Sequence, residues 1–118
     1  MKSLLFVHHR LMLGGAERIL VNCLNLFAQN PDYQVTLVLH FLPTDSPYLS
    51  QISPKVKIIS LLDDHQSREF ADIDGFFDDK GESYQTRFYA LRALLCDKMA
   101  QLLSTEKVDC VINFNTHF

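Results

Sequence analysis

Four short apolar runs alternate along this chain with two longer stretches of helical periodicity. The runs cover residues 2–8, 35–41, 56–62 and 108–114, and each is rich in leucine, valine, isoleucine or phenylalanine. Uninterrupted apolar runs of this length are typical of parallel strands that are covered on both faces. Strands that alternate with helices form right-handed βαβ units. The sequence therefore predicts an α/β protein with a mostly parallel sheet.

The two helical stretches carry apolar stripes that would pack against this sheet. The first follows Gly14–Gly15, ends at the proline of residues 30–32, and has its stripe at Ala16, Ile19, Leu20, Cys23, Leu24 and Phe27. The second spans residues 84–105, with Phe88, Leu91, Leu95, Met99 and Leu102 on one face. We expect a Rossmann-like parallel sheet with flanking helices and strand order 3-2-1-4. Between the second and third strands we expect at most one short helix, at residues 48–52.

Length and charge narrow the class of protein. A chain of 118 residues fits one domain, and we expect residues 1–118 to be an incomplete one, because a doubly wound sheet usually continues beyond four strands. The formal net charge of −3 argues against nucleic acid as a partner. The longest apolar runs are too short to span a bilayer. Cys23, Cys96 and Cys110 are expected to be reduced core residues, which favours a cytoplasmic protein.

The segment from residue 63 to residue 82 differs from the rest of the chain. It holds eight acidic and two basic residues, a net charge of −6. One interpretation is a solvated mobile loop. The alternative is a small amphipathic element that closes over a site or docks on a partner, because the segment also contains four large apolar residues: Phe70, Ile73, Phe76 and Phe77.

The glycine pair between the first strand and the first helix suggests a binding turn. Glycine allows close backbone approach, and the N–H groups at a helix start attract anions. Three familiar versions of such a turn are absent. The spacing is not G-x-G-x-x-G, no Gly-Lys pair makes a P-loop, and His8 and His9 stand where a phosphate-accepting receiver domain needs acids.

The most specific motif in this region is the run from Leu11 to Asn22, LMLGGAERILVN. It resembles the opening of retaining glycosyltransferases of family four, in which a first strand leads through G-G-A-E-R into the first helix. That resemblance implies the amino-terminal, acceptor-side domain of a GT-B fold, with a carboxyl-terminal donor-binding domain absent from this sequence. The implied function is transfer of a sugar from a nucleotide-sugar to a glycan or lipid-linked acceptor, with retention, in lipopolysaccharide or capsule synthesis.

The resemblance also implies roles for particular residues. Gly14 and Gly15 would approach the diphosphate or sugar of the donor, which is a co-substrate, so no cofactor is expected. The family's two donor glutamates belong to the absent domain. We therefore expect this chain to be inactive alone, and the whole enzyme to work at the cytoplasmic face of a membrane, with peripheral membrane contact.

The remaining candidates follow the first and fourth strands, where open α/β sheets bind ligands. Residues expected to line the cleft are His9, Arg10, Arg18, Asn113, Asn115 and His117. Alternation along the strand sends His8 and His9 to opposite sides, so no metal site is expected. Glu17 is expected to stabilise the helix start. No catalytic residue is assigned. The alternative function is a non-catalytic module that binds a phosphorylated ligand or, through residues 63–82, a protein.

Overall fold

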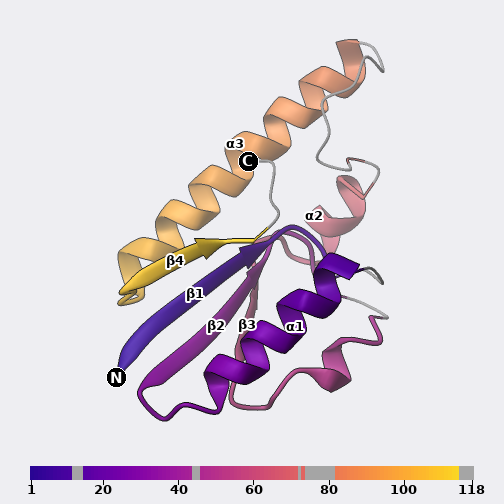
Figure 1. Ribbon diagram of the computed structural model, residues 1–118. Helices are drawn as coiled ribbons and strands as arrows, with labels where there is room; N and C mark the ends of the chain where they lie inside the picture. Colours follow the sequence, from indigo (N-terminus) through magenta and orange to yellow (C-terminus); the bar gives the residue numbers. More distant parts are fainter. Residues whose placement is uncertain (12–14, 44–45, 72, 74–81, 115–118) are drawn as a thin grey trace.

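The structure, a computed structural model, describes residues 1–11, 15–43, 46–71, 73 and 82–114 (Figure 1). Its centre is a four-stranded, all-parallel sheet with the order β3-β2-β1-β4. The strands are β1 (Lys2–His8), β2 (Tyr33–Leu39), β3 (Lys57–Ser60) and β4 (Cys110–Asn113). This confirms the predicted Rossmann-like α/β fold and its strand order. The third and fourth strands are shorter than the apolar runs that predicted them.

Strand β1 lies at the centre of the sheet and is buried on both faces. Leu5 is in register with Thr36 of β2 on one side and with Val111 of β4 on the other. Leu4 and Phe6 belong to the apolar core on one face of the sheet, whereas their neighbours Leu5 and Val7 belong to the core on the opposite face. This explains the uninterrupted apolar run from Leu4 to Val7, since these positions are buried on both faces of the sheet.

Helix α1 (Gly15–Ala28) covers one face of the sheet, with a stripe that only partly matches the predicted one. Ile19 was expected in the core and is 57% exposed, and Cys23 and Phe27 are only half-buried. The buried positions are Glu17, Leu20, Val21, Leu24 and Ala28. The predicted stripe is therefore confirmed at Leu20 and Leu24 and wrong at Ile19. The buried face is rotated toward Val21 and Ala28, and it begins at a buried glutamate that apolar periodicity does not report.

Helix α3 (Glu82–Thr105) covers the other face. Here the predicted face is confirmed: Phe88, Leu91 and Leu95 are buried, and Met99 and Leu102 are half-buried against the same core. Of the helices in the described part of the chain, none is both long and apolar enough to cross a membrane.

The acidic segment is not simply a solvated loop. It contains helix α2 (Asp64–Glu69), whose start is fixed by a capping box: Asp63 accepts a hydrogen bond from the Gln66 amide, and the Gln66 side chain accepts one from the Asp63 amide. Phe70 and Ile73 are buried in the core beneath α3. The solvated-loop interpretation is therefore wrong for residues 64–70 and for Ile73. Phe76 and Phe77 lie outside the described residues.

Two smaller predictions met different outcomes. The short helix expected near residue 50 is the 3₁₀ helix η1 (Leu49–Gln51). The cysteines were expected in the core, but Cys96 and Cys110 are exposed and Cys23 is half-buried. Cys110 lies on β4, an edge strand that contacts only β1 among the described strands, and such a strand buries fewer of its side chains.

Candidate functional site

Helix α1 follows β1 on one face of the sheet and α3 precedes β4 on the other, and doubly wound sheets bind ligands where two such neighbouring strands end. Figure 1 shows α1 beginning next to the carboxyl end of β1. Hydrogen bonds join the last residues of β1 to Phe114, the residue that follows β4. The Phe114 amide donates to the Val7 carbonyl (2.7 Å), and the His8 ring bonds through Nδ1 to the Phe114 carbonyl (2.7 Å).

His8 is the most enclosed polar side chain at this edge of the sheet, with an exposed fraction of 0%. Its Nε2 atom lies 3.8 Å from Oε1 of Glu17, whose side chain is 10% exposed. Glu17 stands in the first turn of α1, where a carboxylate also benefits from the N-terminal end of the helix dipole. One imidazole thus contacts groups at the end of β1, the start of α1 and the end of β4.

His9 does not point away from His8, as alternation predicted. The two rings lie 4.8 Å apart between centroids, tilted by 56°. The alternation argument was wrong because β1 ends at His8, and the period of two applies only within a strand. Within the ranges described, no group of three or more His, Cys, Asp or Glu side chains could hold a metal ion.

His40, which sequence reasoning did not select, completes the histidine cluster. It follows β2, is buried, and its amide donates to the His8 carbonyl. Burial, and to a smaller extent the neighbouring His9 and His8, lower the pKa of His40 to about 4. His40 is therefore neutral at physiological pH. The sequence did contain a signal for His40, because this residue lies at the end of the second predicted strand, where ligands commonly bind.

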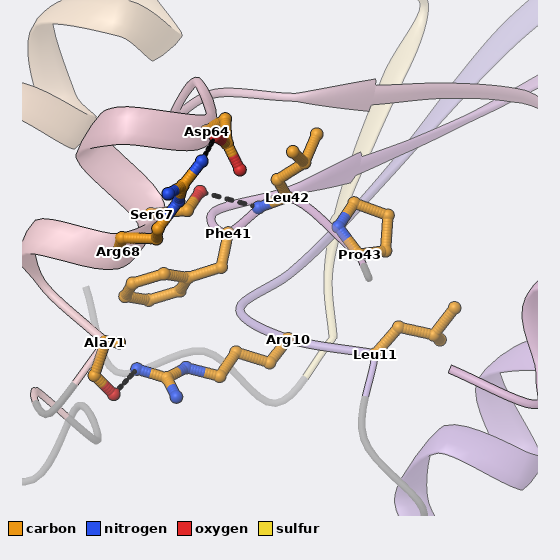
Figure 2. A pocket seen from close by; sticks show the side chains of 9 residues that line it. All are labelled: Arg10, Leu11, Phe41, Leu42, Pro43, Asp64, Ser67, Arg68 and Ala71. Carbon is orange, nitrogen blue, oxygen red and sulfur yellow. Dashed lines mark hydrogen bonds and ion pairs between the residues drawn. The ribbon is translucent and has the colours of Figure 1, made fainter. Parts of the chain in front are cut away.

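Arg10 is held against the segment that follows α2. Its guanidinium donates to the carbonyl oxygens of Ala71 (2.8 Å) and Ile73 (2.6 Å) and lies 4.0 Å from the centroid of the Phe41 ring. Figure 2 shows the side chain extended beneath Phe41 toward Ala71. These contacts fix an arginine at the carboxyl end of the sheet, where the sequence placed a cleft-lining residue.

A cavity of about 290 Å³ lies beside Arg10, between α2 and the segments that follow β1 and β2 (Figure 2). One wall is apolar and the other carries the polar side chains of α2. Ser67 Oγ accepts a hydrogen bond from the Leu42 amide (2.9 Å), and Arg68 is ion-paired with Asp64. The lining consists of Arg10, Leu11, Phe41, Leu42, Pro43, Asp64, Ser67, Arg68 and Ala71.

The sequence did not identify the α2 wall of this cavity, although a signal was present. Asp63 followed by Gln66 at the third position is the pattern of a capping box, and it precedes Ser67 and Arg68. The acidic composition of the surrounding segment masked that pattern.

The other predicted site residues are distributed more widely. Gly15 is the first residue of α1, and Arg18 is exposed one turn further. Asn113 lies on the opposite face, in a mainly apolar groove of about 280 Å³ under α3 that it shares with Val7, His40, Leu61, Leu95, Cys96, Met99, Leu103 and Val111. Gly14, Asn115 and His117 lie outside the described residues. Of the predicted residues, the structure gathers Gly15, His9 and Arg10 at one edge of the sheet.

Comparison with known proteins returned no match to a family model, a curated protein or a solved structure.

Proposed function

We propose that this chain is the acceptor-side domain of a retaining glycosyltransferase that moves a sugar from a nucleotide-sugar to a glycan or lipid-linked acceptor, in surface glycan synthesis at the cytoplasmic face of a membrane. The supporting observation is the position of Gly15 at the start of α1. This helix starts near the carboxyl end of β1, which pairs with β4, and doubly wound sheets bind ligands at such a position.

Gly15 itself also supports the donor-side role, because packing does not require a glycine at this position. A Cβ added at Gly15 would meet no described atom within 4 Å, and the backbone does not have the positive φ that favours glycine. Glycine in the middle of a helix costs roughly 0.5–1 kcal/mol relative to alanine, and at the first helical position it gives no gain in helix stability. A glycine at this position is therefore best explained by something outside the fold that must approach the backbone closely, such as the donor diphosphate.

The cavity beside Arg10 is our candidate for the acceptor. The cavity lies at the carboxyl ends of the strands, as Gly15 does. It combines an aromatic and aliphatic wall with hydroxyl, guanidinium and carboxylate groups. Sugar acceptors present both apolar ring faces and hydroxyl groups. Its volume, about 290 Å³, suits one or two sugar rings by the usual size of small-molecule sites.

The test is amide NMR of the full chain titrated with UDP-glucose and GDP-mannose at millimolar concentration. We expect shifts at Gly15, Ala16 and Glu17. The decisive variant is Gly15→Ala, which should fold with equal or greater stability and lose these shifts. Because a donor site in such enzymes is shared by two domains, we expect weak binding and no sugar transfer by this chain alone.

Two results would overturn the proposal. The donor-side role fails if neither nucleotide-sugar moves the amides of Gly15–Glu17, or if Gly15→Ala binds as well as the wild type. Shifts confined to residues 63–71 would instead favour the non-catalytic binding module. Arg92→Lys on the exposed face of α3 serves as the control variant and should bind like the wild type.

A further inference from the structure

The hydrogen bond between His8 and Phe114 fixes which ring nitrogen of His8 carries a proton. A backbone carbonyl oxygen can only accept, so at 2.7 Å the Nδ1 atom must be the donor. In a neutral ring the other nitrogen, Nε2, would then be a bare acceptor. That atom is fully buried, and no described residue forms a hydrogen bond with it.

The group that faces this buried nitrogen is also an acceptor. Oε1 of Glu17 lies 3.8 Å from Nε2, and an ionised carboxylate has no hydrogen to give. Two acceptors that face each other away from water repel, and each would lose the hydrogen bonds that it makes in the unfolded chain. A proton on Nε2 removes this conflict, because it turns the contact into an ion pair between an imidazolium and a carboxylate.

The titratable groups around the His8 ring support this assignment. Those in the described part of the chain are Glu17 on α1, His9 next in sequence, and His40 at the end of β2. His40 stays neutral because its pKa is lowered to about 4. Glu17 is the only acid among these groups, and a proton on His8 leaves the pair with no net buried charge.

We propose that His8 and Glu17 form a buried, proton-holding pair that fastens the first turn of α1 and the end of β4 to the end of β1. His8 donates through Nδ1 to the Phe114 carbonyl, and its protonated Nε2 faces the Glu17 carboxylate as an ion pair at 3.8 Å. Both are positioning residues: they set the distance between the first turn of α1 and Phe114, which follows β4. The inference concerns the strand ends at which the proposed function places the donor, although its test requires no ligand.

The experiment is long-range ¹⁵N–¹H NMR of the histidine rings in the full chain, which reports the protons on each nitrogen. At pH 7 we expect wild-type His8 to carry protons on both nitrogens. In Glu17→Gln we expect His8 to keep only its Nδ1 proton, because the carboxylate that stabilises the second one is gone. Glu106→Gln, which removes an exposed carboxylate paired with Lys57, is the control and should leave His8 unchanged.

A wild-type ring with one proton at pH 7, or with the neutral proton on Nε2, would overturn the proposal. This measurement of the His8 ring needs only the wild-type chain, so it tests the proposal even if Glu17→Gln does not fold. An unchanged His8 in a folded Glu17→Gln would also overturn it. A failed nucleotide-sugar titration bears on the proposed function alone, since the histidine spectrum is recorded without any nucleotide.

Discussion

The Arg10 guanidinium lies over the Phe41 ring, 4.0 Å from its centroid, and joins residues that follow two adjacent strands. Its two hydrogen bonds to the Ala71 and Ile73 carbonyls attach the segment after α2 to the same edge. One side chain therefore ties the carboxyl ends of β1 and β2 to the path that leads toward α3.

We expect Arg10→Lys to lower the free energy of unfolding by about 1–3 kcal/mol. Lysine keeps the charge, but its ammonium lacks the planar fork that serves two carbonyls and a ring together. Urea unfolding measures the change. Arg92→Lys on the exposed face of α3 is the matched control, and an equal effect of both substitutions would show that Arg10 has no special role.

The buried stripe of α1 can be tested with two neighbouring aliphatic residues. Val21→Ala should destabilise the protein by about 1.5–3 kcal/mol, because Val21 is 3% exposed. Ile19→Ala removes more apolar volume but should change stability by no more than about 0.5 kcal/mol, because Ile19 is mostly exposed. Thermal unfolding of the two variants measures these losses of stability. A larger loss in Ile19→Ala than in Val21→Ala would favour the buried stripe that was predicted from the sequence.

The capping box should hold α2 in place as one wall of the acceptor cavity. Asp63→Ala removes the side-chain acceptor for the Gln66 amide and should cost about 0.5–2 kcal/mol. Hydrogen exchange is the appropriate measurement, with faster exchange expected at Gln66 and the following turn. Asp97→Ala, an exposed substitution within α3, is the control. Unchanged protection in Asp63→Ala would mean that tertiary packing alone fixes α2.

Acid should destabilise the fold through His40. Its pKa is about 4 in the folded chain and near 6.5 when unfolded, so between these values the unfolded chain binds more protons. Stability is fully present above about pH 6.5 and falls as the pH drops toward 4, by roughly 2–4 kcal/mol. His40→Gln should flatten this part of the profile in urea unfolding, whereas His65→Gln, on the exposed side of α2, should not. Parallel profiles for His40→Gln and wild type would contradict this assignment.

The sheet could be predicted because its signal is local. Each strand lies within an apolar run, and this run is buried along β1 and β2, whereas β3 and β4 are only partly covered. The strand order follows from right-handed βαβ connections. The face of α3 could be predicted for the same reason, since only one apolar stripe runs along it. In α1 the buried face includes Glu17, which faces His8, and a search for apolar periodicity does not select an acidic residue.

The site was harder to predict because its contacts join distant parts of the chain. Arg10 bonds to residues more than 60 positions away, and His8 to a carbonyl 106 positions away. Patterns of neighbouring residues in the sequence do not indicate contacts between such distant positions. Arg10 was selected only because strand ends are common binding positions, and the polar wall on α2 was missed because a charge-rich segment resembles a loop.

The central position of β1 also determines when the sheet can be completed. Its pairing with β2 joins segments about 30 residues apart, whereas its contact with the β4 side, such as the Ser3 amide with the Asp109 carboxylate, spans 106 residues. Closing the longer loop costs more entropy, and β4 is also synthesised after the other three strands of this sheet. One side of β1 therefore stays unpaired until β4 is available. In pulse-labelling during refolding, we expect amides between β1 and β2 to gain protection before those between β1 and β4.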